Sequence, residues 1–395
     1  LHVRSRRQRQ MCIRDRHRQV LNMEILLESF QQLTPSHIFM LLIGFLLIYL
    51  AIAKQYEPTL LLPMGFGVIL VNIPLSGAIS QLSEGSVVQG ILDLLFNAGI
   101  ATELFPLLIF IGIGAMIDFG PLLERPSMLF LGASAQFGIF FTLIIALCCG
   151  FSLQEAASIG IIGAADGPTS IFVASQLSPS LLGPISVAAY SYMALVPLIQ
   201  PMAIKWVTTK KERCIHMTYT STPVSRKAKL LFPIVVTLVS GFIAPHSIPL
   251  IGFLMFGNLL RESGVVNRLS ETAQNELVNI VTILLGLSIA STMKADTFLT
   301  PSTILIIGMG LIAFIFDTIG GVLFVKVINL FRKEKINPMV GAAGISAFPM
   351  SARTIQKLAK EEDPHNFILM QAVGANVAGQ VASVIAGGLI LALLL

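Results

Sequence analysis

The chain has 395 residues, of which 54% are hydrophobic and only 12% are charged. Soluble proteins average about 25% charged residues, so this composition excludes an ordinary soluble protein and indicates a lipid environment. The net charge of +5 does not indicate nucleic-acid binding, because the basic residues gather in short loops between apolar runs, as in membrane proteins. No metal-binding spacing links the four cysteines, which are Cys12, Cys148, Cys149 and Cys214.

The beginning of the chain differs from the rest. Residues 1–22 are rich in arginine and lack the apolar core of a secretory signal. Met23 is followed by a short amphipathic piece and then by the first apolar run. We therefore expect residues 1–22 to be a non-native or disordered basic leader, and the first half of the protein to begin at residue 23.

Several apolar runs approach the roughly 20 residues that cross the hydrocarbon core of a bilayer. The sequence therefore predicts an all-α polytopic membrane protein with about 10–11 transmembrane helices and two broken or re-entrant hairpins. The mixed stretch 86–100 is too short to span easily, so we expect an amphipathic helix along the interface or over the bundle. The expected spans are 37–53, 59–74, 103–117, 127–149, 154–165, 183–206, 230–244, 249–260, 277–293, 302–331 and 365–395.

The longest polar loop, 207–229, carries six lysines and arginines but a single acidic residue, Glu212. Two more basic clusters follow at 332–335 and 353–360. Because short cytoplasmic loops are enriched in lysine and arginine, we expect all three on the cytoplasmic side. The long loop would then separate a first half, 23–206, from a second half, 230–395.

Asp166 is the most informative residue of the chain, because an ionisable side chain at bilayer depth is costly and is a functional-site hypothesis by default. It directly precedes Gly167 and Pro168, and proline disfavours helix in the residue before it. Interrupted backbone within a bilayer is tolerated only where it is buried in protein or lines a cavity. The sequence therefore predicts a re-entrant piece at 168–177 with an ion site at Asp166.

A weak internal repeat accompanies this break. The Gly-Ala-Ala run at 163–165 recurs at 341–343, 178 residues later, and the Pro-Ser pair at 126–127 recurs at 301–302 after 175 residues. Broken segments at matching places in two halves are the pattern of inverted-repeat transporters. Coincidence is the alternative, because glycine and alanine are common in membrane helices. We expect the second broken hairpin at 338–350.

The second hairpin and the last span supply further oxygen ligands. Asn337 and Ser346 belong to the hairpin, and Asn376 belongs to the last span. Together with Asp166 they form an all-oxygen set, which suits a hard cation and does not suit zinc or copper. Because a single carboxylate is neutralised by one positive charge, the set favours a monovalent ion, and Na⁺ and H⁺ should compete for it.

Other polar residues in apolar surroundings have two interpretations each. Asp317 fits an ion site or structural hydrogen bonding about equally. Gly379 and Ser383 fit a packing seam as well as a functional face of the last span. Asp118 is expected in a loop, and interfacial anchoring is one interpretation of Tyr190 and Tyr192.

Four stretches make the chain resemble the β subunit of sodium-pumping, biotin-dependent decarboxylases, namely 163–172, 187–201, 208–213 and 337–349. That family includes the oxaloacetate, methylmalonyl-CoA and glutaconyl-CoA decarboxylase complexes. The resemblance implies an inverted-repeat, elevator-like fold in a bacterial-type inner membrane. It implies that the chain decarboxylates carboxybiotin and couples this to Na⁺ export, with consumption of a proton at the ion site.

The resemblance also implies partners and residue roles. The partners are a carboxyltransferase α subunit, a biotin carrier domain or subunit that presents carboxybiotin, and a small membrane γ or δ subunit, in an oligomeric complex. Asp166 would bind Na⁺ and H⁺, Tyr192 would belong to the proton pathway, and Arg353 would meet the carboxylate of carboxybiotin. The remaining Na⁺-binding residues that the resemblance implies are Asn337, Gly341, Ser346 and Asn376.

Two other functions compete with this one. A Na⁺-coupled secondary transporter or Na⁺/H⁺ antiporter would have the same ion site without decarboxylase chemistry, and the residues alone favour it because no reaction is visible in them. A non-transporting membrane scaffold is disfavoured by Asp166 and by the paired breaks, because a scaffold has no use for a buried acid.

Overall fold

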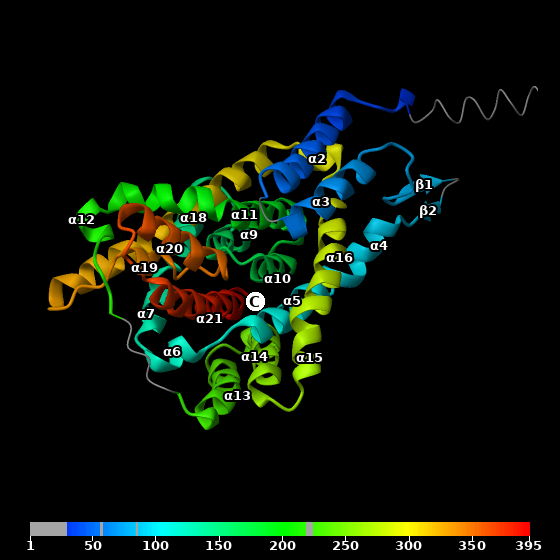
Figure 1. Ribbon diagram of the computed structural model, residues 1–395. Coiled ribbons are helices and arrows are strands. Elements are labelled where there is room, and N and C mark those ends of the chain that lie inside the picture. Colours follow the sequence, from blue (N-terminus) through cyan, green and yellow to red (C-terminus); the bar gives the residue numbers. More distant parts are fainter. Residues whose placement is uncertain (1–29, 56–57, 84–85, 219–223) are drawn as a thin grey trace, which may run out of the picture.

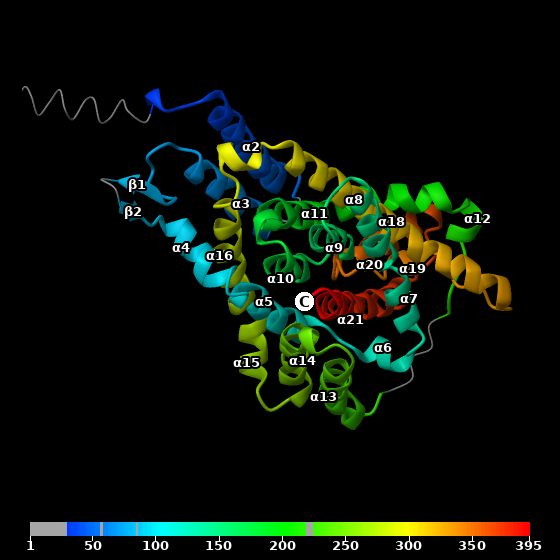
Figure 2. The same cartoon turned by 180° about the vertical axis from the view of Figure 1, so that it is seen from behind.

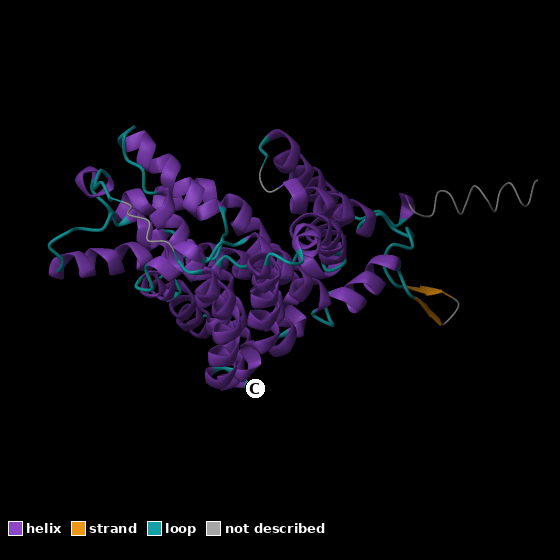
Figure 3. Cartoon of the chain, turned by 60° about the horizontal axis from the view of Figure 1, so that its bottom comes forward, coloured by secondary structure: helices purple, strands orange, loops and turns teal. Residues whose placement is uncertain are grey.

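The computed structural model describes residues 30–395 except for 56–57, 84–85 and 219–223, so the expected leader lies outside the described residues. The described residues form a bundle of helices (Figures 1 and 2). A small antiparallel hairpin of β1 (Gln81–Ser83) and β2 (Ser86–Val88) projects from the bundle (Figure 3). The helical class is therefore confirmed, with this hairpin as an addition that the sequence analysis did not expect.

The helices fall into two groups, and each half of the chain contributes to both (Figure 1). The wall group consists of α2 (Pro35–Ala53), α3 (Pro58–Val71), α4 (Ile91–Gly99), α5 (Leu104–Met116), α13 (Arg226–Ile243), α14 (Ile248–Ser263), α15 (Asn267–Thr272) and α16 (Val278–Ala290). The hairpin group consists of α7 (Met128–Ser134), α8 (Phe137–Cys148), α9 (Leu153–Gly160), α10 (Gly167–Leu177), α11 (Leu182–Val207), α18 (Pro301–Phe331), α19 (Met339–Ala342), α20 (Met350–Glu362) and α21 (Leu369–Leu394). Three short helices connect them, α6 (Gly120–Glu124), α12 (Lys210–Arg213) and α17 (Ala295–Phe298).

Fewer helices than expected are long and apolar enough to cross a membrane. Five segments of the described chain pass this test, and seven do if α4–α5, bent by 61°, and α11, bent by 71°, each count as one span. The expected count of about 10–11 is not reached because segments such as α9, with 8 residues, and α14, with 16, are shorter than the roughly 20 residues that cross the bilayer. The amphipathic helix expected within 86–100 is present as α4, which follows strand β2 and forms a bent pair with α5.

Both expected breaks are present in the hairpin group. The first follows the 3₁₀ turn Ile161–Ala164, where Ala165 has a left-handed φ of +54° and Asp166 is the extended N-cap of α10. The second follows α19, after which the chain stays non-helical until α20 begins at Met350. The backbone N–H of Ser346 donates to the carbonyl oxygen of Ala164 at 3.0 Å. The tips of the two breaks therefore meet in the interior.

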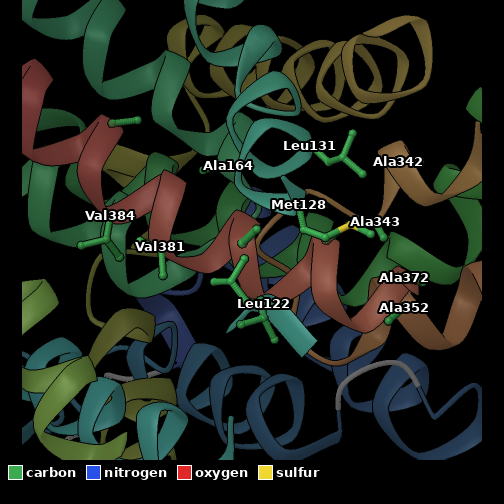
Figure 4. Close-up of a cluster of buried hydrophobic side chains, with 14 of the residues drawn as sticks. Leu122, Met128, Leu131, Ala164, Ala342, Ala343, Ala352, Ala372, Val381 and Val384 are labelled. Atoms are coloured by element: carbon green, nitrogen blue, oxygen red, sulfur yellow. The ribbon is translucent and has the colours of Figure 1, made fainter. Parts of the chain in front are cut away.

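Glycine allows the second tip to insert between α7 and α21. A Cβ on Gly379 would lie 2.0 Å from the carbonyl oxygen of Gly344, and a Cβ on Gly344 would lie 2.5 Å from that of Leu131. Side chains of α7 (Met128 and Leu131), α19 (Ala342) and α21 (Val381) belong to a cluster of buried hydrophobic side chains in this region (Figure 4). The packing interpretation of Gly379 is thus confirmed.

The basic loop packs against the ends of α18 and α20. Arg213 pairs with Glu362 at 2.8 Å between Nε and Oε1, and Lys326 pairs with Glu212 at 3.1 Å between Nζ and Oε1. Partial burial raises the pKa of Glu212, but the Thr209 N–H and the Lys326 ammonium outweigh it and hold that pKa below its ordinary value. Glu212 is therefore charged at neutral pH and keeps α12 beside α18.

Candidate functional site

The carboxylate of Asp166 joins the two halves of the chain. Its Oδ2 accepts hydrogen bonds from the Thr169 hydroxyl at 2.6 Å, the Gln380 amide at 3.1 Å and the Ser383 hydroxyl at 3.1 Å. Thr169 follows Asp166 in α10, whereas Gln380 and Ser383 come from α21. Only 3% of Asp166 is exposed, so these donors take the place of water around a buried acid.

Asp166 lines a cavity of about 160 Å³ between the two helix groups. The hairpin group supplies its polar wall, with Asp166, Tyr190, Ser346 and Gln380. The opposite wall, from α3, α5 and α16, is largely apolar and consists of Thr59, Leu60, Ile109, Ile113, Met116, Val278, Thr282 and Leu285. A ligand in this cavity would therefore find most of its polar contacts on the side of the hairpin group, with only Thr59 and Thr282 opposite.

Two buried oxygens of this region have no hydrogen-bond partner among the described residues. One is the hydroxyl of Tyr190, whose ring packs so closely on Gly167 that a Cβ there would lie 2.4 Å from it. The other is Oδ1 of Asn376, whose Nδ2 donates to the Ile345 carbonyl at 2.6 Å. Asn376 precedes Gln380 by one helical turn on the same face of α21. Since an unpaired buried acceptor is costly, these oxygens fit a cation as a further partner.

The structure brings part of the expected ion-binding set together. Ser346 lines the Asp166 cavity, and its hydroxyl donates to the Gly379 carbonyl at 3.0 Å. Asn376 is buried beside the second tip through its bond to Ile345. Asp166, Ser346 and Asn376 are therefore neighbours of the two meeting tips.

Two other expected residues lie elsewhere. Asn337 uses its amide nitrogen on the carbonyl oxygens of Arg213 and Ile215, at 2.8 and 2.9 Å, and so fastens the second hairpin to the basic loop. Gly341 packs on α18, where a Cβ would lie 2.1 Å from the Gly321 carbonyl oxygen. Contrary to expectation, neither residue lines the Asp166 cavity, because backbone packing at the base of the hairpin occupies them.

Tyr192, expected in the proton pathway, and Arg353, expected to meet the carboxylate of carboxybiotin, also lie outside the Asp166 cavity. Tyr192 donates its hydroxyl to the Ile307 carbonyl of α18 and packs against Gly310. Arg353 is exposed on α20, one turn after the second tip. Lys357 and Lys360 follow it on the same exposed face, so the three form a basic stripe along α20.

Sequence reasoning missed Gln380 and Thr169, and it misjudged Tyr190. Tyr190 is 3% exposed and lines the cavity, so its interpretation as an interfacial anchor is wrong. A signal for Gln380 was its amide in an apolar helix, four residues after Asn376. Ser383, for which packing and function were equal alternatives, contacts the Asp166 carboxylate.

Asp317 is a second buried acid in the hairpin group. Its Oδ1 accepts from the Ile139 backbone N–H at 3.2 Å, at the start of α8, while its Oδ2 has no hydrogen-bond partner among the described residues. A Cβ on Gly163 would lie 2.8 Å from this Oδ2, so Asp317 also touches the first break. Asp118, as expected, lies in a loop, where it accepts from Gly120 N–H and Lys229.

Comparison with known proteins gives matches along nearly the whole chain. Residues 36–394 match the family described as the Na⁺-transporting oxaloacetate decarboxylase beta subunit. Methylmalonyl-CoA decarboxylase subunit beta of Propionigenium modestum is 47% identical over 383 residues, which cover 92% of this chain and 96% of that protein. Glutaconyl-CoA decarboxylase subunit beta of Acidaminococcus fermentans is 50% identical over 365 residues, covering 92% and 95%. The oxaloacetate decarboxylase beta chain of Haemophilus ducreyi is 46% identical over 429 residues, covering 93% and 98%.

Proposed function

This chain belongs to the family of the Na⁺-transporting oxaloacetate decarboxylase β subunit, and we propose that it decarboxylates carboxybiotin and couples this reaction to Na⁺ export. Its relatives are decarboxylase β subunits, and its apolar helices suit a multi-pass membrane protein. The observation that carries the proposal is the buried Asp166 carboxylate in a cavity between two helix groups. We also propose that the protein is located in a bacterial inner membrane.

The proposed ion site is formed by Asp166, Ser346 and Asn376, with Tyr190 and Gln380 beside them. Oxygen ligands suit Na⁺, and a single carboxylate becomes neutral when one Na⁺ or one H⁺ binds. The unpaired oxygens of Tyr190 and Asn376 support a cation over a purely structural network. Na⁺ and H⁺ would therefore exchange at Asp166, so that release of Na⁺ outward leaves a proton on the carboxylate.

The chemistry consumes that proton. When carboxybiotin loses CO₂, the bond between the ureido nitrogen and the carboxyl carbon breaks, and its electron pair remains on the nitrogen. The nitrogen then takes up one proton, which the cycle draws from Asp166. Each decarboxylation would in this way reset the carboxylate for the next Na⁺.

The carboxybiotin would approach from the basic side of the protein. Arg353 and the stripe of lysines on α20 run toward the second tip, and such cations pair well with a carboxylate. Asn337 and Gly341 would hold the second hairpin in place. Tyr192 would belong to the proposed proton pathway by holding α11 against α18. The proposed partners are a carboxyltransferase α subunit, a biotin carrier and a small membrane subunit.

One contact supports the proposed inverted repeat. Ile139 and Asp317, joined by a hydrogen bond, are 178 residues apart, which is the offset of the two Gly-Ala-Ala runs. Residues at equivalent positions of two repeats contact each other in this way when they lie near the two-fold axis that relates the repeats. The Asp166 cavity also lies between the wall group and the hairpin group. That position supports an elevator-like movement in which the hairpin group carries the ion along the wall group.

The test is Na⁺-dependent decarboxylation of carboxybiotin by the purified complex in proteoliposomes, with Na⁺ uptake measured in parallel. Asp166→Asn should reduce both activities by about 100-fold or more, because a buried charge partner is lost. Asp118→Asn, which changes a loop carboxylate, is the matched control and should leave both nearly unchanged. Retention of Na⁺-dependent decarboxylation in Asp166→Asn would contradict the proposal, and Na⁺ uptake that ignores carboxybiotin would indicate a simple transporter.

A further inference from the structure

A large cavity among the basic residues at the ends of α7 and α18 is separate from the Asp166 cavity. This head cavity has a volume of about 880 Å³ and is formed by the start of α7, the end of α18 and the loops beside them. Its polar rim contains Arg125, His216, Arg332, Glu334 and Lys335. None of its lining residues also lines the Asp166 cavity, so the ion site does not account for it.

An apolar slot continues the head cavity toward the middle of the membrane domain. The slot has a volume of about 550 Å³, lies between α7–α8 and α18, and shares Phe130 and Phe324 with the head cavity. The side chains of Phe130, Phe137, Phe140 and Val327 along it are each at least half exposed. A polar chamber therefore opens into a long apolar one on the outer surface of the helices.

The charge of the head cavity favours an anion. Arg332 and Lys335 are exposed, and neither has an ion-pair partner in the described part of the chain. Among the residues that line the head cavity, Glu334 is the one acidic side chain. His216 is already paired with Asp363, at 2.7 Å between Nε2 and Oδ2. The two free cations and Arg125 thus outnumber that single acid.

A small carboxylate or phosphate would fill the head cavity and leave the slot empty. An apolar segment of a partner subunit would fill the slot but would not use the cationic rim. An anionic head joined to a long hydrocarbon chain uses both, and basic pockets at the cytoplasmic ends of helices bind such lipids. We propose that the head cavity and slot bind one anionic phospholipid, with its phosphate at Arg332 and Lys335 and an acyl chain along the slot. This inference does not depend on the proposed function.

The test measures lipid binding to the full chain, purified with the partner subunits that it retains. Native mass spectrometry in neutral detergent would compare dioleoylphosphatidylglycerol with dioleoylphosphatidylcholine. We expect phosphatidylglycerol to bind at least about tenfold more tightly, and the double change Arg332→Gln with Lys335→Gln to weaken it by about 30-fold. Lys333→Gln is the matched control, because Lys333 lies between them in sequence but lines neither chamber.

The slot has its own test. Ala133→Trp would fill it and should weaken both lipids by about tenfold, whereas Ile304→Trp, on an exposed part of α18 far along the helix, should not. Equal affinity for the two lipids, or an unchanged affinity in the double variant, would overturn the proposal. Equal competition by glycerol phosphate would indicate a free-phosphate site instead. A photocrosslinker at Phe130 that captures a partner subunit in native membranes, and no lipid, would also overturn it.

Discussion

Asp166 and Asp317 are both buried carboxylates in the hairpin group, but they are held in different ways. Asp166 accepts from three side chains and only weakly, at 3.5 Å, from a backbone N–H, that of Thr169, and it faces a cavity. Asp317 accepts from backbone N–H at the start of α8 and lines neither the Asp166 cavity nor the head cavity or the slot. Side-chain donors can turn away when an ion arrives, and backbone donors in a helix cannot. Burial alone therefore does not identify an ion site, and under the proposed function the distinguishing feature is exchangeable donors beside a cavity.

The largest expected difference between the two acids is in Na⁺ binding. Raising Na⁺ to about 100 times its dissociation constant should stabilise the parent protein by about 2.7 kcal/mol, because Na⁺ binds the folded state. Asp166→Asn should abolish this stabilisation, and Asp317→Asn should keep most of it. Thermal unfolding in detergent, with K⁺ replacing Na⁺ at constant ionic strength, measures both. If Asp317→Asn also lost the response, the distinction between the two acids would be wrong.

The next effect concerns stability without Na⁺. Asp317→Ala removes one of the two acceptors of the Ile139 N–H, which keeps the Gln136 carbonyl oxygen at 3.2 Å, and should reduce the free energy of unfolding by about 0.5–1.5 kcal/mol. Asp317→Asn keeps a carbonyl oxygen for that N–H and should lose clearly less. Chemical unfolding in Na⁺-free buffer gives the comparison. Equal losses in the two variants would show that the backbone contact is not what Asp317 contributes.

A smaller effect is expected from the donors around Asp166. Gln380→Ala removes one donor to the carboxylate and an oxygen from the polar wall, so half-maximal activation should need about tenfold more Na⁺. The rate at saturating Na⁺ should change much less. Gln371→Ala, near the beginning of the same helix, is the control and should leave the Na⁺ requirement unchanged. An unchanged requirement in Gln380→Ala would remove Gln380 from the site.

The smallest expected effects separate the two tyrosines. Tyr190→Phe removes an unpaired hydroxyl from the cavity and should weaken Na⁺ activation about threefold without loss of stability. Tyr192→Phe removes the bond to Ile307 and should reduce stability by about 1 kcal/mol while the Na⁺ requirement stays constant. The reverse result would show that Tyr192, and not Tyr190, acts at the ion site. Na⁺ titration of activity and thermal unfolding of both variants decide between the outcomes.

Local chemistry in the sequence was sufficient to find Asp166 and both breaks. The Gly-Pro pair predicts where the helix stops, and the acid beside it marks the segment as a candidate site. Ser346 and Asn376 could be found in the same way, because each is a polar side chain in an apolar context. The apolar wall of the cavity could not, since its residues look like any other lipid-facing or packing residues.

Long-range packing decided what the sequence could not. Tyr190 and Tyr192 are two positions apart, so they point in directions about 200° apart on α11, and only the rotation of that helix determines which one faces Asp166. Asn337 was expected at the ion site, but the carbonyl oxygens of Arg213 and Ile215, more than 120 residues away, occupy its amide. Neither the orientation of Tyr190 toward Asp166 nor the bonds of Asn337 can be read from the residues next to them in sequence.

The largely apolar wall of the Asp166 cavity has an electrical consequence. Under the proposed function, an ion held by the hairpin group finds little on α3, α5 and α16 to which it could be handed over. The wall group would then act as an insulator, and charge would cross the bilayer only as fast as the hairpin group moves. Each 100 mV of membrane potential is worth about 2.3 kcal/mol per elementary charge, so a back-leak through the cavity would dissipate stored energy. One-sided binding would thus protect the voltage that the export of Na⁺ creates.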